Sequence, residues 1–270
     1  MLEETEIQSW EDFDYLLGKN HYRQWIYRGQ SDSSWNMESS IHRAFENAQS
    51  IHALGQGQEK KLNRRSHEIV MLDKFKCNAH LYLNHLPQQE DDFSWLSLMQ
   101  HHGAPTRLLD FSFSFYVALY FALESGENDA SIYCINHDSI KNDDDSYFGE
   151  ERLEVYKRIL DGQKNKDDEC LFAFEPTFSN QRILSQQGLF VATNTLKYTH
   201  EKILNDYQIH KEDAFKIIIP KELRLMGLKK LHQMNINSTN IYPGLDGFSK
   251  SLIKQPVFGL QWQKRVGNEL

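Results

Sequence analysis

The stretch "GAPTRLLDFSFSFYVALYFALE", residues 103–124, contains a helix break, a strand and a buried helix in direct succession. Gly103 and Pro105 should end any helix before them, because glycine and proline are the strongest local breakers of regular structure. The segment "TRLLDFS" then predicts a strand, and "FYVALYFALE" predicts a helix. That helix is apolar on nearly every side, so little of its circumference could face water without a free-energy cost. We therefore expect a strand that leads into a largely buried helix.

A second informative stretch, "WIYRGQSDSSW" at residues 25–35, places an arginine at the end of a short aromatic run. A strand is predicted over Trp25–Arg28, and Gly29 begins a polar loop. Leucine would suit a core at position 28 better than a cation, so one interpretation is a structural arginine paired with an acid such as Asp110. We favour a binding role for Arg28, because residues at strand ends and in the following loops carry binding groups disproportionately often.

Two helices are predicted from local spacing before the central stretch. Residues 9–17 place their apolar side chains on one face, and Ser9 with Asp12 three residues on is typical of a capping box. Residues 93–101 have a broad apolar face, and Asp91 or Asp92 is suited to cap their first turn.

Further strands are predicted at "SIYCI", "GLFVAT" and "FKIIIP". Residues 136–170 are polar and acid-rich, which is typical of an exposed insertion. The sequence has no strong linker and no internal repeat. We therefore interpret residues 1–270 as one α+β domain with a peripheral insertion.

The composition is that of an ordinary globular protein. The chain has 270 residues, of which 40% are hydrophobic and 25% charged, so it has enough apolar side chains for a substantial core. Its first residues lack the basic and apolar regions of a secretory signal, and its apolar runs are too short to span a bilayer. The three cysteines are widely spaced and odd in number, which argues against a disulfide framework. We expect a cytoplasmic protein.

Charge is distributed unevenly along the chain. The net charge is -8, yet residues 216–265 contain nine Lys or Arg against two acids. The interpretation we favour is a solvated surface whose partner charges lie elsewhere in the fold, and the alternative is a nucleic-acid face.

Several classes of protein lose support because their motifs are missing from the sequence. There is no phosphate-binding glycine fingerprint of the kinase or Rossmann type. Gly-x-Ser-x-Gly and His-Glu-x-x-His are also missing, which removes support for serine hydrolases and zinc proteases. His101 and His102 are adjacent on a helix end and point in different directions, so we expect no metal site there.

The two opening stretches together resemble the FRG domain family, which is named for a Phe-Arg-Gly tripeptide. That tripeptide is matched by Tyr27-Arg28-Gly29, and the family's Gln-(x)2-Gly-x-Pro-Thr-Arg-Leu-Leu-Asp run is matched from Gln100 to Asp110. Residues 118–122 match the Ala-Leu-Tyr-Phe-Ala element that follows. The later segments "NQRILSQQGLF" and "IYPGLDG" resemble further family elements, so the resemblance covers about residues 20–250.

The order of these features is similar to the ADP-ribosyltransferase fold, in which a first-strand arginine holds NAD and a serine element supports the nicotinamide ribose. This resemblance implies a split β-sheet core flanked by helices, with NAD as substrate and no metal. A guanidinium presents a rigid fork of donors that suits a pyrophosphate. The NAD-binding residues implied are Tyr27, Arg28, Gly29, Gln30, Arg43, Thr106, Arg107, Asp110, Ser112, Ser114, Arg182 and Gln186.

The catalytic residues implied are Arg28, Ser112 and a carboxylate. Breaking the bond between ribose and nicotinamide builds positive charge on the sugar, which a nearby carboxylate stabilises. Transferases of this kind usually carry Glu-x-Glu or Gln-x-Glu, whereas this chain has Gln186-Gln187 with no acid beside them. We select Glu175 as the catalytic carboxylate, ahead of Asp110 and Asp246.

The resemblance predicts an ADP-ribosyltransferase that modifies a macromolecular acceptor and acts as a bacterial toxin or antiphage effector, held in check by an inhibitory antitoxin protein. The basic C-terminal segment contains interleaved aromatic residues, which makes RNA or another nucleic acid the first acceptor and protein the second. The alternatives are an NAD glycohydrolase and a non-catalytic module that binds a nucleotide or nucleic acid.

Overall fold

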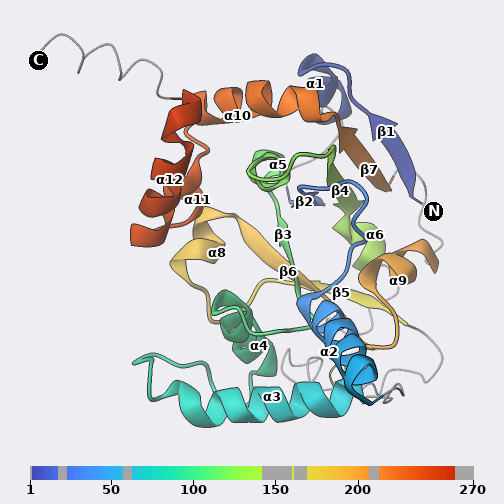
Figure 1. Cartoon of the computed structure of the whole chain (residues 1–270), viewed down its shortest axis with the longest axis vertical. Helices are drawn as coiled ribbons and strands as arrows, with labels where there is room; N and C mark the ends of the chain where they lie inside the picture. Colours follow the sequence, from blue (N-terminus) through green and yellow to red (C-terminus); the bar gives the residue numbers. More distant parts are fainter. Residues whose placement is uncertain are drawn as a thin grey trace, which may run out of the picture.

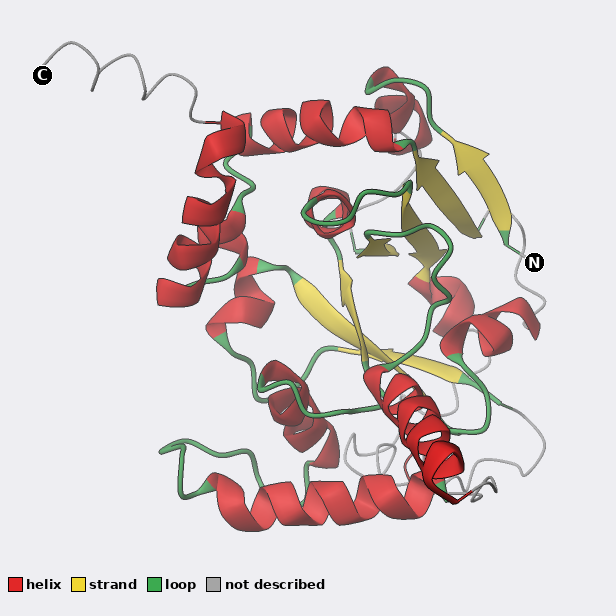
Figure 2. Cartoon of the chain, in the orientation of Figure 1, coloured by secondary structure: helices red, strands yellow, loops and turns green. Residues whose placement is uncertain are grey.

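The structure is a computed structural model that describes residues 2–17, 23–56, 63–141, 160, 169–206 and 213–258. The described residues form one seven-stranded mixed sheet with helices around it (Figures 1 and 2), so the predicted α+β fold is confirmed. The strand order is β1-β7-β4-β2-β3-β6-β5. The strands are β1 (Glu3–Glu6), β2 (Trp25–Gln30), β3 (Leu109–Ser112), β4 (Ala130–Asn136), β5 (Leu171–Phe174), β6 (Gly188–Thr193) and β7 (Ala214–Ile219).

The helices gather in groups around the sheet. In Figure 1, α10, α11 and α12 lie near one end of the molecule, α3 and α4 lie near the other, and α5 lies between these groups. The helices are α1 (Glu11–Leu17), α2 (Ser40–Gln56), α3 (Arg64–Ala79), α4 (Asp92–His101), α5 (Phe115–Leu123), α6 (His137–Lys141), α8 (Gln181–Ser185), α9 (His200–Asp206), α10 (Arg224–Gln233), α11 (Ser238–Ile241) and α12 (Leu245–Phe258), with a 3-10 turn η1 (Lys221–Leu223).

The sheet is nearly parted between β2 and β3. These two antiparallel strands are in register at one position, Tyr27 opposite Ser112, whereas β2 pairs with β4 along all of Trp25–Gln30. On the other side, β3 pairs with β6 along Leu109–Ser112. The sheet therefore consists of two well-paired halves that meet at a single pair of residues.

The predicted buried helix is α5, which packs against β2, β3 and β4. Its buried side chains include Leu119 and Ala122. Gly29 of β2 permits this packing, because a Cβ there would overlap the main-chain oxygen of Ala118 and lie 2.7 Å from the main-chain nitrogen of Ala122. The glycine of the aromatic-Arg-Gly motif is thus explained by close approach of a strand to a helix backbone.

The predicted helix caps are present. The Asp12 carboxylate accepts a hydrogen bond from the Ser9 main-chain N–H at 2.9 Å, and Asp91 accepts one from Ser94 N–H at 3.1 Å. Ser114 caps α5 by accepting from Val117 N–H at 3.4 Å, a common role for serine at a helix N-terminus. Most of the acid-rich segment, residues 142–159 and 161–168, lies outside the described residues.

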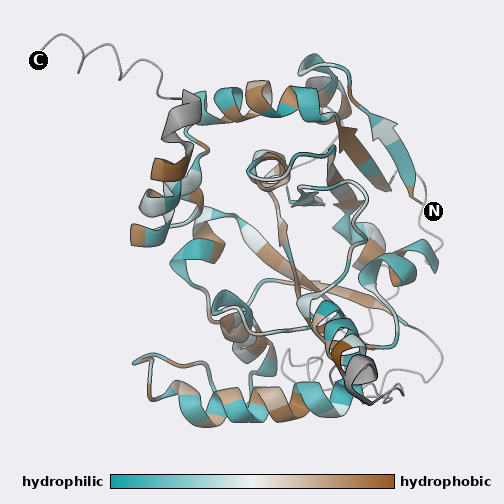
Figure 3. Ribbon diagram, in the orientation of Figure 1, coloured by the Kyte–Doolittle hydropathy of each residue, from teal (hydrophilic) through white to brown (hydrophobic). Residues whose placement is uncertain are grey.

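Hydropathy follows the position of each strand in the sheet. Figure 3 shows β7 as largely hydrophobic, whereas its parallel neighbour β1, at the edge, is largely hydrophilic. The sequence "AFKIII" of β7 lies between two strands, while "EETE" of β1 has one neighbour. Within the described residues, none of the helices has the length and apolar character needed to cross a membrane.

Two buried histidines are held in the neutral form. The Nε2 of His200 lies 3.1 Å from the Val191 carbonyl oxygen, and the Nδ1 of His42 lies 2.8 Å from Ser39 Oγ. Burial, and then the charge of Arg64, lowers the pKa of His42 from 6.5 to about 4. Burial, and then the neighbouring His42, lowers the pKa of His200 to about 3.

The protein should therefore lose stability on mild acidification. Below the ordinary histidine pKa the unfolded chain binds protons that the native imidazoles do not, so the free energy of unfolding falls as pH drops. Each buried histidine should shift the unfolding equilibrium roughly tenfold per pH unit in this range. Thermal unfolding at about pH 7.5, 6 and 5 measures the effect, with the exposed His80→Gln as a control that keeps the slope. An unfolding midpoint that stays constant over this range would contradict the prediction.

Candidate functional site

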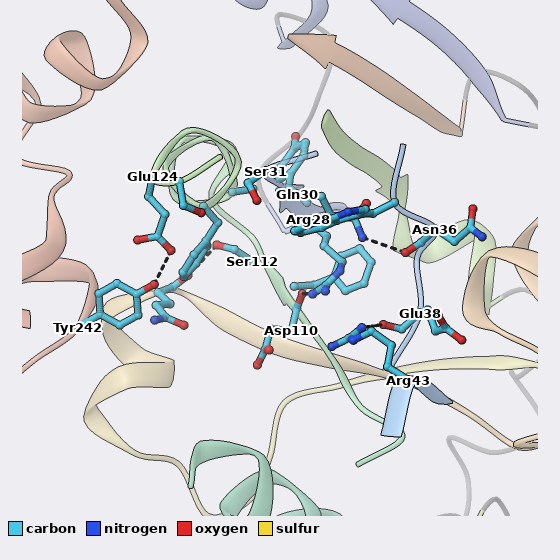
Figure 4. Close-up of a pocket in the computed structure, with 18 of the residues that line it drawn as sticks. Arg28, Gln30, Ser31, Asn36, Glu38, Arg43, Asp110, Ser112, Glu124 and Tyr242 are labelled. Atoms are coloured by element: carbon cyan, nitrogen blue, oxygen red, sulfur yellow. Dashed lines mark hydrogen bonds between the residues drawn. The ribbon is translucent and has the colours of Figure 1, made fainter. Parts of the chain in front are cut away.

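A cavity of about 860 Å³ opens where the sheet parts. Its walls come from β2, the loop after it, β3, and the C-terminal end of α5, with further residues from α8 and from the turn between α11 and α12. Figure 4 shows Arg28 and Asp110 in the middle, Glu124 and Tyr242 on one side, and Asn36, Glu38 and Arg43 on the other. The volume is within the range of small-molecule sites, about 300–1,000 Å³.

Arg28 bridges the two halves of the sheet. Its guanidinium donates to the main-chain oxygen of Asp110 on β3 at 2.8 Å, and its buried Nε has no hydrogen-bond partner among the described residues. Burial lowers the pKa of Arg28; Asp110 opposes this shift, and Arg43 adds to it. A buried donor without a partner is rare in native proteins and calls for an explanation.

The loop after β2 is held in place by side chains around it. Gln30 Nε2 donates to the Asn36 oxygen at 3.2 Å, and the Glu201 carboxylate accepts from Met37 N–H at 2.7 Å. Tyr133 donates to the same Glu201 oxygen at 3.1 Å. Within this anchored loop Trp35 lines the cavity and is 55% exposed.

Three carboxylates line the cavity in the part of the chain that the structure describes. Asp110 lies on β3, Glu38 follows the loop after β2, and Glu124 caps the end of α5. The Tyr242 hydroxyl donates to Glu124 Oε1 at 2.7 Å. Burial, and then Glu124, raises the pKa of Tyr242 above its ordinary value. The cavity therefore has acid groups at both ends and cations between and beside them.

The structure brings most of the predicted site residues to this cavity, from segments far apart in the sequence. They include three arginines, which supply positive charge, and polar side chains on both halves of the sheet. The predicted residues that line the cavity are Tyr27, Arg28, Gly29, Gln30, Arg43, Asp110, Ser112, Arg182 and Gln186.

Thr106 and Arg107 belong to the scaffold and do not line the cavity. The Arg107 Nε donates to both Glu68 oxygens at 2.9 and 3.0 Å, and its Nη1 donates to the Thr193 oxygen at 2.8 Å. The Arg107 side chain is 2% exposed. The Thr106 main-chain N–H donates to Ser40 Oγ at 3.0 Å, and Thr106 is buried. Both residues thus connect the segment before β3 to helices α2 and α3, and neither lines the cavity.

Glu175 and Ser114 are also outside the set of lining residues. Glu175 directly follows β5, an edge strand, and forms an ion pair with Arg23 in which both side chains are about half exposed. Ser114 is the cap of α5 described above. The choice of Glu175 as the catalytic carboxylate therefore places that group away from Arg28 and its cavity.

Ser112 and Gln186 hold the two sides of the cavity floor together. The Ser112 hydroxyl donates to the Gln186 main-chain oxygen at 2.6 Å and accepts from Ser114 N–H at 2.9 Å. The Gln186 side chain donates to the Ile241 oxygen at 3.0 Å. Both residues line the cavity, yet their donors are already engaged within the protein.

Sequence reasoning missed Trp35, Glu38, Glu124 and Tyr242 as lining residues. For one of them, Glu124, the local sequence contains a feature that could have indicated its role. Glu124 follows a helix of nine apolar and aromatic residues, and an acid at a helix C-terminus is opposed by the helix dipole. Such a local conflict often marks a functional position. Trp35 and Tyr242 lie in the quoted stretches "WIYRGQSDSSW" and "IYPGLDG", which did not mark them individually as lining residues.

Comparison with known proteins supports the motif analysis. Residues 23–131 match the model of the FRG domain family, so the predicted resemblance is confirmed for that segment. The matched range begins just before β2 and ends within β4, and so includes both strands at the parting of the sheet. No curated protein and no solved structure gave a significant match.

Proposed function

We propose, on the premise that residues 23–131 form an FRG domain, that the protein binds NAD in the cavity at the parting and transfers ADP-ribose to a macromolecular acceptor. The observation that carries the proposal is the buried, unpartnered Nε of Arg28 at the cavity. Arg43 is close enough to lower the pKa of Arg28, and two arginines that converge on a cavity favour a phosphate group between them.

The chemistry requires few groups from the protein. The bond between the ribose C1′ and the nicotinamide nitrogen breaks, and its electron pair leaves with nicotinamide, which becomes neutral. An acceptor oxygen or nitrogen then bonds to C1′ and loses its proton. A carboxylate beside the ribose stabilises the positive charge that develops on the sugar. We assign this role to Glu124, because it lines the cavity and Tyr242 orients it through a hydrogen bond of 2.7 Å.

The acceptor we propose first is RNA or another nucleic acid, with protein second. Tyr242 at the cavity has the Lys250 ammonium 3.6 Å and the Arg182 guanidinium 5.3 Å from its ring centre. Cations beside an aromatic ring are suited to a phosphate backbone and its bases. The described part of the basic segment, residues 216–258, contributes Lys250 to this group.

A non-catalytic nucleotide-binding module is the second candidate. Gln186 lines the cavity without an acid beside it, and its side chain is occupied by the Ile241 carbonyl. Such a module would bind NAD and leave it intact. In an NAD glycohydrolase, water would take the place of the acceptor. The same assay separates all three activities.

The assay uses NAD labelled in its adenylate half and follows nicotinamide release together with label on RNA or protein from a cell lysate. Release with transfer of label to RNA is the result expected. Release without transfer identifies a glycohydrolase, and binding without release identifies a non-catalytic module. An absence of both NAD binding and nicotinamide release would overturn the proposal.

Replacing Glu124 by glutamine should lower nicotinamide release by roughly 100-fold, because a neutral amide stabilises the developing cation poorly. Affinity for NAD should change by less than about threefold, since the charge appears only in the transition state. Glu175→Gln is the matched control and should retain near wild-type activity, because Glu175 pairs with Arg23 outside the cavity lining. An inactive Glu175→Gln beside an active Glu124→Gln would reverse the assignment.

A further inference from the structure

The cavity has two chemically different ends. Glu124 and Tyr242 lie at one end, whereas Asn36, Glu38 and Arg43 lie at the other, with Arg28 between them (Figure 4). NAD is itself a molecule with two nucleoside halves joined by a pyrophosphate. If the pyrophosphate binds at Arg28, each end of the cavity receives one nucleoside half of NAD. The residues at the two ends then determine which half binds at which end.

Trp35 gives the second end an aromatic surface. Trp35 lines the cavity and is 55% exposed, although tryptophan is normally well covered. The surrounding loop is anchored through its main chain. The Trp35 main-chain N–H donates to the Asp32 main-chain oxygen at 3.3 Å, and the Trp35 main-chain oxygen accepts from the Tyr133 hydroxyl at 3.4 Å. An exposed indole on an anchored loop is suited to stacking against a base, because little ordering is needed on binding.

Glu38 gives the same end a free acceptor. Arg43 donates to the main-chain oxygen of Glu38 and not to its carboxylate. Among the described residues that carboxylate has no hydrogen-bond donor, and Glu38 lines the cavity. Burial, and then Glu46, raises the pKa of Glu38, while Arg43 and Arg64 lower it. An ionised carboxylate is acceptor-only, and it suits the neighbouring hydroxyls of a ribose.

We propose that Trp35 and Glu38 form an adenosine subsite, in which the indole stacks on adenine and the carboxylate accepts from the ribose hydroxyls. This inference rests on the proposed function and assigns the nicotinamide half to the Glu124 end. It also implies selectivity, since a 2′-phosphate would stand beside the Glu38 carboxylate. Like charges at close range repel, so NADP should bind more weakly than NAD.

Calorimetric titration of the full chain with NAD and NADP tests the selectivity. NAD should bind about tenfold more tightly than NADP to the wild type, because discrimination by a repulsive charge is typically worth about a factor of ten or more. Glu38→Gln should reduce the ratio to about threefold or less, since an amide neither repels the phosphate nor accepts as strongly. Glu46→Gln, which removes an exposed carboxylate near Glu38 but outside the cavity lining, should leave the ratio unchanged.

A second titration tests the orientation. Trp35→Ala should weaken ADP-ribose about tenfold, the usual effect of losing one stacking surface, and leave nicotinamide mononucleotide unaffected. Trp35→Phe should restore most of the affinity for ADP-ribose, and Tyr15→Ala, which removes an exposed aromatic ring outside the cavity lining, should have no effect.

The outcomes distinguish the subsite from the proposed function. Equal weakening of both ligands by Trp35→Ala, or a ratio that Glu38→Gln leaves unchanged, overturns the subsite while NAD cleavage stands. A wild-type protein that binds neither NAD nor ADP-ribose overturns both proposals.

Discussion

Replacing Arg28 by alanine is expected to weaken NAD binding by roughly 100-fold or more. Charge-assisted hydrogen bonds are worth about 1.5–3 kcal/mol each, and the guanidinium offers an unpartnered Nε at the cavity. The pyrophosphate would lose this donor and the positive charge together. Arg28→Lys should recover only part of the affinity, because an ammonium lacks the planar fork of donors.

The fold should survive this change. Within the described part of the chain the side chain makes one hydrogen bond, to the Asp110 main-chain oxygen, so the loss of stability should be about 1 kcal/mol. Calorimetric titration with NAD measures the affinity, and thermal unfolding verifies that the variant is folded. Arg65→Ala is the matched control, since Arg65 is exposed on α3 and does not line the cavity. An Arg28→Ala protein that binds NAD within about threefold of the wild type would remove the arginine from the site.

Replacing Gly29 by alanine is expected to destabilise the protein by at least about 3 kcal/mol. The added methyl group would overlap the main-chain oxygen of Ala118 and approach Ala122 N to 2.7 Å. Neither atom belongs to a side chain that could rotate away, so β2 and α5 would have to separate. Because this packing joins the strand of Arg28 to the central helix, the cavity should be lost with the fold.

Urea unfolding measures the difference, and Gly103→Ala provides the comparison. Gly103 has a φ of +81° with nothing within 4 Å of an added Cβ, so alanine there should cost only the strain of a left-handed backbone, about 1–2 kcal/mol. If Gly29→Ala were as stable as Gly103→Ala, the close approach would not be the reason for the glycine.

Elements with strong local signals were predicted well. The strand at residues 25–28, the capped helix that ends at His101 and the buried helix after Ser114 all appear near their predicted bounds. Each depends on side chains a few residues apart. The strand order and the parting between β2 and β3 depend on pairings between distant segments, which no local pattern specifies.

For Arg107 and Asp110, which lie in one segment, local spacing predicts only part of the arrangement. Their spacing predicts that they face opposite sides, with one lining the site and the other tying the scaffold together, and the structure places Asp110 at the cavity and Arg107 against Glu68. The sequence could not decide which residue faces the cavity. Glu68 lies on a helix 39 residues away, and only the fold brings it to the arginine.

In the candidate site, too, some residues could be predicted from local motifs and others could not. Residues in distinctive motifs, such as Arg28 and Ser112, reach the cavity, and so does Arg182. Glu175 does not. It follows β5, an edge strand that β6 separates from β3, and its carboxylate pairs with Arg23. Glu38 reaches the cavity through the fold, and Glu124, although its position after an apolar helix is a local signal, is brought opposite Tyr242 by the fold as well.

The most direct test of NAD binding at the parting of the sheet is a crystal structure of the protein with NAD bound. We expect the pyrophosphate within hydrogen-bond distance of Arg28 Nε, the adenosine half beside Trp35 and Glu38, and the nicotinamide ribose beside Glu124. NAD bound elsewhere on the protein, with the cavity between β2 and β3 left open, would contradict the assignment of this site.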